Sequence, residues 1–275
     1  MADITSTAFG CGGPNGSGLA EDLTGQAGWL LVSLNAGTAP TWVTDADFDD
    51  GFAVDLNSTD QQVVTYDASG VTDPDKALAL GSYLNDMIFA VQFKLDAIGA
   101  IEPIFVASDD DNFDRFVLWV DETGRFSVSE LGDSGYSGYA DVVLVADTVY
   151  DVAVSRYNVS GVTVEYAISI NGTVYTPVTA FGVPQNGGSG YTVNATNGWA
   201  ALGGPYIVNE YDEVEDVYVD VPYRFNGRIS RYEQFRVGAP MFTRSDPTYS
   251  YTYYSCASDP TDFWQGFRST VETTP

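Results

Sequence analysis

Hydrophobic and polar positions along this chain follow the pattern of short β-strands. Apolar or alternating runs recur at a spacing of roughly 8–14 residues, which is typical of sandwiches built from many short strands. No segment repeats its apolar positions with the 3.6-residue period of a helix. Turn sequences such as Asp121–Gly124 and Asn171–Gly172 separate neighbouring runs. We therefore expect strands over residues 29–34, 52–56, 62–66, 87–95, 104–107, 115–120, 125–129, 142–146, 150–157, 162–170, 173–176 and 227–237.

The two ends of the chain depart from this pattern. Residues 1–47 are rich in Gly, Ala, Thr and Asp, which predicts an irregular N-terminal arm or small attachment segment. Residues 243–275 are rich in Tyr, Ser, Thr and Asp, and exposed rings in such a tail would be unfavourable. We expect this C-terminal tail to pack on the sandwich or on a neighbouring subunit. The central domain then spans residues 48–242.

Four stretches of the chain carry a family resemblance: Gly51–Asn57 with Gln62–Val64, Asn85–Phe93, Val149–Arg156 with Tyr166–Gly172, and Ala201–Gly204 with Phe225–Phe235. Taken in their order, they resemble the concanavalin A-like, laminin-G-type jelly-roll domains. The Trp that usually precedes the third motif of that family is replaced here by Val149 or Tyr150, so the chain resembles a distant member. The resemblance implies an all-β, two-sheet antiparallel jelly-roll sandwich, and it implies fold more than function because such domains serve as lectins, hydrolases, adhesins and structural modules.

The composition excludes several kinds of chemistry. Without any His, the chain cannot carry a Ser-His-Asp or Cys-His nucleophile or a zinc site that needs imidazole. A pI near 4.1 implies repulsion of phosphates, so we expect no direct nucleic-acid partner. No apolar run is long enough to cross a bilayer, so we expect no membrane insertion. Cys11 and Cys256 either bridge the arm to the tail or remain two buried thiols.

The net charge of −27 bears on the environment of the protein. Repulsion among the acidic residues destabilises a compact state in dilute buffer, and salt screens that repulsion. A saline environment with a halophilic host explains the charge, and so does an ordinary acidic surface protein. The first residues show no secretion signal, so we expect either assembly in the cytoplasm of a host cell or a signal that was trimmed.

Clustered carboxylates are the first candidate site. Asp109, Asp111 and Asp114 surround Asn112 in one loop, and such a loop supplies the hard oxygen ligands that Ca²⁺ prefers. The aspartates of residues 45–50 form a second cluster of the same kind. The alternative is a solvated acidic loop, which is common in a chain this acidic. No cofactor is required in either case, and calcium is the one candidate.

Aromatic residues near Gly- and Ser-rich segments are the second candidate site. Tyr136, Tyr139, Tyr191 and Trp199 lie in or beside such segments, where rings can stack on the faces of sugars. Loop aromatics also serve to anchor loops or interfaces, so both interpretations stay open.

A group of arginines on an otherwise acidic chain is the third candidate site. Arg224, Arg228, Arg231 and Arg236 lie on and beside the last expected strand. They could contact an acidic surface of a second subunit, or they could neutralise the acidic run of residues 210–220 within the chain.

One acidic motif raises the question of catalysis. Glu210–Glu215 resembles the E-x-D-x-x-E motif of laminarinase-type glycoside hydrolases, in which the first Glu acts as nucleophile and the last as general acid/base. On a strand, Glu215 would face away from Glu210 unless a bulge intervened. The motif also lies in an acidic run where it arises easily by chance. We therefore expect a protein that is not an enzyme, with a retaining glycoside hydrolase as the alternative.

Taken together, the arm, the jelly-roll domain and the aromatic tail predict a virion structural protein of a tailed virus. We expect a capsid decoration, turret or fibre-type component, assembled as a homo-oligomer with other virion proteins and located in the virion. The alternative is a carbohydrate-binding or adhesive module, calcium-dependent or not, whose partner is a host surface glycan. The two functions are compatible, because a particle can use such a domain to bind its host.

Overall fold

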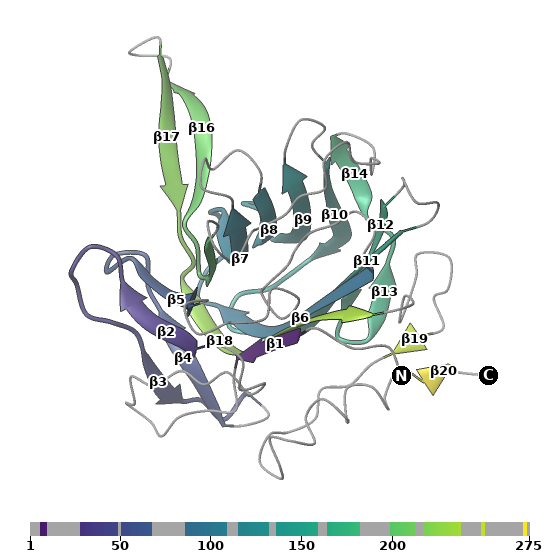
Figure 1. The fold of residues 1–275 in the computed structure, drawn as a ribbon, viewed down its shortest axis with the longest axis horizontal. Coiled ribbons are helices and arrows are strands. Elements are labelled where there is room, and N and C mark those ends of the chain that lie inside the picture. The colour runs from purple at the N-terminus through teal and green to yellow at the C-terminus, as the bar shows by residue number, and fades with distance from the viewer. Residues whose placement is uncertain are drawn as a thin grey trace.

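The strands assemble into two antiparallel sheets that pack face to face (Figure 1). The computed structural model of the 275-residue chain describes residues 6–9, 28–48, 51–67, 86–108, 115–131, 136–158, 164–181, 199–212, 217–237, 249–250 and 272–273. Within these ranges there is no helix, and therefore no helix suited to cross a membrane. The expected all-β antiparallel sandwich of the jelly-roll class is confirmed.

One sheet, called sheet A here, has the strand order β13-β12-β11-β6-β18-β4-β3, and β1 also pairs with β18. Its strands are β1 (Ser6–Phe9), β3 (Thr41–Thr44), β4 (Phe52–Leu56), β6 (Asp86–Leu95), β11 (Val149–Asn158), β12 (Val164–Ile170), β13 (Thr173–Tyr175) and β18 (Gly227–Val237).

The facing sheet B has the order β14-β10-β9-β8-β7-β15-β5-β2. Its strands are β2 (Gly28–Ser33), β5 (Gln62–Asp67), β7 (Glu102–Ser108), β8 (Arg115–Val120), β9 (Arg125–Leu131), β10 (Tyr136–Val143), β14 (Val178–Phe181) and β15 (Trp199–Leu202). Two short ribbons complete the described structure: β16 (Tyr206–Asp212) with β17 (Val217–Tyr223), and β19 (Tyr249–Ser250) with β20 (Glu272–Thr273).

The core lies between the sheets and is formed by every second residue of the central strands. On β8, Phe116 and Leu118 are buried, and on β6 of the opposite sheet so are Phe89 and Phe93. The rings of Phe89 and Phe116 stack across the two sheets with their centroids 4.5 Å apart. Each such side chain contributes roughly 1.5–3 kcal/mol by its removal from water, so the period-two pattern of the sequence is the main source of the fold.

One charged contact also crosses this core. Glu130 of β9 lies opposite Arg156 of β11, whose Nε and Nη2 atoms donate to its two oxygens at 3.3 and 3.2 Å. The hydroxyl of Tyr166, on β12 beside Arg156, donates to the same carboxylate. Burial raises the pKa of Tyr166 well above its ordinary value, so the hydroxyl stays protonated and remains a donor. The three side chains therefore bind the two sheets together at one end of the sandwich.

The structure also shows where the expected strands and segments differ from the actual ones. Residues 142–146 were expected to form a strand, but β10 ends at Val143, and the N–H of Val145 bonds the hydroxyl of Tyr150 in a turn. Of the segment 1–47, which we expected to be an arm, β2 and β3 are hydrogen-bonded into the two sheets. Cys11, Cys256 and nearly all of residues 243–275 lie outside the described residues.

Candidate functional site

The outer face of sheet B carries a row of aromatic and polar side chains across three neighbouring strands. Trp119 of β8 pairs with Ser127 of β9, and Ser127 pairs in turn with Tyr139 of β10. Directly paired residues share one face of a sheet. Because Leu118 and Phe126 lie in the core, this row faces away from it. Trp119 and Tyr139 are partly exposed, so the row presents rings to the surroundings of the protein.

A chain of hydroxyl groups fixes the tryptophan ring of this row. The indole Nε1–H of Trp119 donates to Ser129 Oγ at 3.0 Å, and Ser129 Oγ donates to Ser137 Oγ at 3.0 Å. Ser129 and Ser137 are buried, so both hydroxyls need the partners that they find here. The ring is thereby held in one orientation before any ligand arrives, which lowers the entropic cost of binding.

A cation lies next to the row. The guanidinium carbon of Arg125, at the start of β9, lies 4.9 Å from the centre of the Tyr139 ring. Arg125 and Ser127 are two positions apart on one strand, so their side chains share a face. One face of the Tyr139 ring is thus occupied by Arg125. We call Trp119, Arg125, Ser127 and Tyr139 the outer-face cluster.

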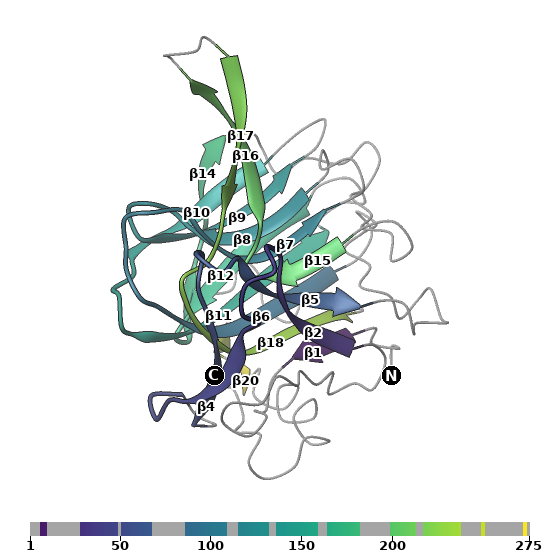
Figure 2. The same cartoon turned by 90° about the vertical axis from the view of Figure 1, so that its left-hand side faces the viewer.

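The ribbon β16–β17 stands beside this cluster and extends away from the sandwich in both views (Figures 1 and 2). Its base packs on sheet B, where Tyr206 forms a small buried cluster with Val106 and Val117. The rings of Trp119 and Tyr206 are 5.9 Å apart at an angle of 49°. The ribbon therefore flanks the outer-face cluster on the side of β8.

Backbone contacts anchor the base of the ribbon. Phe225 N donates to Gly203 O at 3.1 Å, and Gly203 N donates to Ile104 O at 3.0 Å. Asn226 N donates to the buried Glu102 carboxylate at 2.7 Å, and Asn226 Oδ1 accepts the N–H of Ser58 at 2.9 Å. The end of the ribbon is thus fixed to β7 and to the turn between β4 and β5.

Glu102 gives this anchor a pH dependence. Burial raises the pKa of Glu102 to about 7, although the N–H of Asn226 opposes the shift. Its pKa in the unfolded chain is lower, near 4.5, so the folded state holds the proton more tightly and loses stability as the pH rises from about 4.5 to about 7.

Glu102→Gln keeps an acceptor and removes the charge. We expect it to raise the free energy of unfolding by about 2–3 kcal/mol at pH 8 and by little at pH 4.5. Urea unfolding at the two pH values measures this, and an equal effect at both would contradict the assignment.

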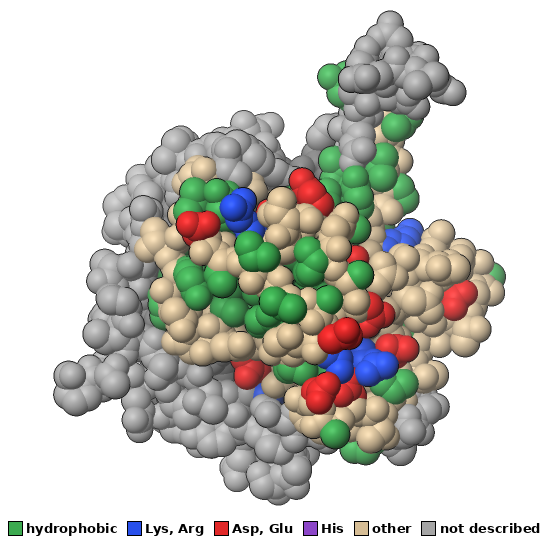
Figure 3. All heavy atoms as spheres, turned by 180° about the vertical axis from the view of Figure 1, so that it is seen from behind, with side chains coloured by type: hydrophobic (Ala, Val, Ile, Leu, Met, Phe, Trp, Pro, Cys, Tyr) green, Lys and Arg blue, Asp and Glu red, His purple; other side chains and the backbone are tan. Residues whose placement is uncertain are grey.

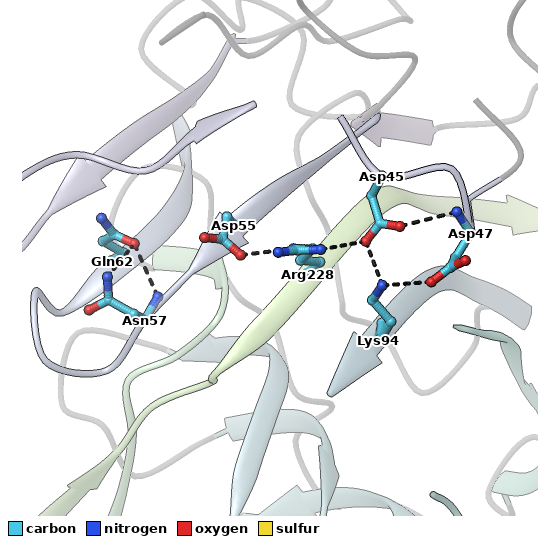
Figure 4. A network of polar contacts seen from close by, with 7 residues as sticks. All are labelled: Asp45, Asp47, Asp55, Asn57, Gln62, Lys94 and Arg228. Atoms are coloured by element: carbon cyan, nitrogen blue, oxygen red, sulfur yellow. Dashed lines mark hydrogen bonds and ion pairs between the residues drawn. The ribbon is translucent and has the colours of Figure 1, made fainter. Parts of the chain in front are cut away.

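An ionic network lies on the outer face of sheet A (Figure 4). Lys94 Nζ contacts Asp45 Oδ2 at 2.6 Å and Asp47 Oδ2 at 3.0 Å. Arg228 bridges two aspartates: its Nη1 lies 2.7 Å from Asp45 Oδ2, and its Nε lies 3.0 Å from Asp55 Oδ1. Burial disfavours the charged form of Asp45, yet the hydrogen bonds from Lys94 and Arg228 outweigh it and hold the pKa of Asp45 below its ordinary value. On the face seen in Figure 3, basic side chains likewise lie beside acidic ones.

This network bears on two of the predicted sites. Asp45 and Asp47 of the second acidic cluster bond to cationic side chains, and no group of three metal-ligating side chains occurs among the described residues. Of the predicted subunit-contact residues, Arg228 is engaged within the chain, Arg231 is fully buried, and Arg224 donates to Gln61 at 3.1 Å. Arg236 lies on β18, but its side chain is outside the described part.

The predicted glycan and calcium residues are only partly described. Tyr139 belongs to the outer-face cluster, on strand β10 rather than in a loop. Tyr136 and Trp199 begin β10 and β15, and their side chains are outside the described part. Tyr191, Asp109, Asp111 and Asp114 lie outside the described residues. The sequence analysis missed Trp119 and Arg125, although the alternation of residues 115–120 places Trp119 opposite to Leu118.

The acidic motif falls on the ribbon. Glu210 lies on β16, opposite Val219 of β17, and Glu215 lies outside the described residues. The distance between the two carboxylates, which a hydrolase mechanism requires to be about 5–5.5 Å, is therefore not defined.

Comparisons with known proteins find solved structures of similar fold at low sequence identity. No protein-family profile and no curated protein matches the sequence. Domain 4 of AbnA, a GH43 extracellular arabinanase from Geobacillus stearothermophilus in complex with arabinotriose, is similar with a TM-score of 0.52 and 18% identity over 85% of this chain and 92% of that chain. The CBM40 of the Ruminococcus gnavus IT-sialidase, bound to α2,3 sialyllactose, has a TM-score of 0.41 and 16% identity over 66% of this chain and 88% of that chain. Trypanosoma rangeli sialidase in complex with sialic acid has a TM-score of 0.49 and 9% identity over 84% of this chain and 31% of that chain. At these identities, the likeness to the arabinanase domain establishes the fold alone.

Proposed function

We propose that the protein is a non-catalytic carbohydrate-binding module that binds glycans on the outer face of sheet B. The observation that carries this proposal is the Trp119 ring, which is partly exposed and is fixed by its hydrogen bond to Ser129. A sugar ring presents C–H groups on its faces, and a rigid indole offers a flat apolar surface for them at little entropic cost.

The surroundings of Trp119 support the same function. Arg125 lies over the ring of Tyr139 in the same outer-face cluster, and Tyr206 at the base of the ribbon β16–β17 contacts Trp119 on one side. The similar arabinanase domain was solved with arabinotriose, so this fold can carry a sugar site.

The virion role that we expected from the sequence does not enter this proposal. None of the three structures compared above is a virion protein, and no contact in the described part of the chain bears on a particle. That role, the homo-oligomer and the location in a virion remain predictions. Binding of a host glycan by a particle would be compatible with the function proposed here.

The test is a glycan array followed by calorimetry on the best ligand. We expect Trp119→Ala to weaken binding by about 10- to 100-fold, because a central aromatic contact contributes roughly 1.5–3 kcal/mol. Leu30→Ala is the matched control: Leu30 is 48% exposed and lies on the same outer face, four strands away or roughly 19 Å from β8.

The control should bind like the wild type. Absence of any bound glycan, or equal loss in both variants, would contradict the proposal.

A further inference from the structure

Arg125 is a described basic side chain without a carboxylate partner, as is Arg224, which donates to Gln61 instead. Lys94, Arg156 and Arg228 each bond to a carboxylate. The Arg125 side chain has no carboxylate partner anywhere in the described structure, and it lies over the Tyr139 ring. In a chain with 38 acidic and 11 basic residues, a cation without a counter-ion is unusual.

The acidic side chain at the start of the preceding turn, Asp121, is already engaged elsewhere. Asp121 Oδ1 accepts the backbone N–H groups of Thr123 and Arg125 at 2.9 Å each, and the Thr123 hydroxyl at 2.7 Å. This carboxylate closes the turn between β8 and β9 and leaves the guanidinium group unpaired. The fold thus keeps an acid close to Arg125 in sequence without using it as a counter-ion.

The guanidinium group itself has unused donors. Arg125 Nε is buried and has no hydrogen-bond partner, which is costly for a charged donor. The terminal nitrogens make no hydrogen bond to a described residue, and Arg125 as a whole is partly exposed. Tyr139 covers one face of the planar group and limits its motion. A planar, pre-positioned guanidinium group with free N–H donors is the arrangement that binds a carboxylate through two hydrogen bonds.

Arg125 also lies within reach of a sugar on Trp119. Ser127 pairs directly with Trp119, and Arg125 is two positions from Ser127 on the same face. Diagonal neighbours of this kind are about 7–8 Å apart between their backbones, a distance that a long side chain spans. A ligand that stacks on Trp119 can therefore place a carboxylate against Arg125.

We propose that the outer-face cluster selects glycans that carry a carboxylate, with Trp119 binding a sugar ring and Arg125 binding the acid group. This inference rests on the carbohydrate-binding function proposed above. Hexuronic acids and sialic acids share the required chemistry. The net charge of −27 repels acidic ligands at long range, so selection depends on this short-range contact.

Calorimetry in 0.5 M NaCl tests the proposal with two matched pairs of probes. Trigalacturonate is compared with galactotriose, and sialyllactose with lactose, and the pair that responds identifies the source of the carboxylate. We expect the acidic member of one pair to bind about 10- to 100-fold more tightly than the neutral member, as a charge-assisted hydrogen bond of about 1.5–3 kcal/mol implies. Arg125→Met should reduce the affinity for the acidic member to the affinity for the neutral member. Arg125→Lys should keep part of the preference for the acidic member.

The outcomes separate this inference from the function on which it rests. Equal affinity for neutral and acidic members, or an Arg125→Met variant that still prefers the acid, overturns the carboxylate selection. If neutral sugars bind and Trp119→Ala abolishes their binding, the proposed function stands while this inference fails. If no probe binds to the wild type, both are wrong.

Discussion

Arg156→Met is expected to lower the free energy of unfolding by about 3 kcal/mol, because it leaves the Glu130 carboxylate, whose side chain is only 22% exposed, without its cation. Arg156 is 2% exposed, and both of its bonds to Glu130 join sheet A to sheet B. The Met side chain fills much of the same space, so the loss reflects charge more than volume. Urea unfolding followed by tryptophan fluorescence measures the change.

Two further variants make this prediction specific. The same substitution at Arg125, which is partly exposed and has no carboxylate partner in the described structure, should change stability by less than about 1 kcal/mol. Adding Glu130→Gln to Arg156→Met removes the unpaired charge and keeps an acceptor for Tyr166, so it should recover part of the loss. An Arg156→Met variant as stable as the wild type would show that the contact contributes nothing.

Gly227→Ala is expected to lower the free energy of unfolding by roughly 3–5 kcal/mol. Two effects add up: the new Cβ atom clashes with a neighbouring strand, and an L-residue is strained at this backbone conformation. Gly227 begins β18 between β6 and β4, with φ of +149°. A Cβ atom at this position would lie 2.2 Å from the carbonyl oxygen of Lys94, which belongs to the backbone of the neighbouring strand and cannot turn away. The sheet must therefore open locally or the strand must shift.

Gly99→Ala is the matched control for the backbone term. Gly99 has φ of +129°, and a Cβ atom there meets nothing within 4 Å. Gly99→Ala should lower the free energy of unfolding by only about 1–2 kcal/mol, the ordinary penalty for an L-residue at positive φ. Thermal unfolding of both variants separates the two terms, and equal losses would argue against a clash at Gly227.

Much of the fold could be predicted from the sequence, because the signals are local. Residues 227–237 were expected as one strand and form β18, and the turn at Asn171–Gly172 has the positive φ values of 48° and 79° that favour these residues. β10 was missed since Gly, Ser and Tyr alternate in it with few apolar residues. The ribbon β16–β17 was hidden by its acidic residues.

The site could be predicted only in part, because its contacts join residues far apart in the sequence. Alternation alone places Trp119 outside the core, but its neighbours Ser127 and Tyr139 depend on the register of three strands. Arg228 and Asp45 are 183 positions apart, so nothing local in the sequence indicates that they pair. For the same reason, the unpaired state of Arg125 was visible only after the partners of the other cations were known.

The central claim, that glycans bind on the outer face of sheet B, is tested most directly by the indole N–H signals in ¹H–¹⁵N NMR spectra. The chain has five Trp residues, and Trp119→Phe identifies the signal of Trp119. Titration with a glycan that binds on the array should shift the Trp119 signal most strongly, because the indole ring that carries this N–H forms the proposed sugar-binding surface. Binding that leaves the Trp119 signal unchanged while another indole responds would place the site elsewhere and contradict the account.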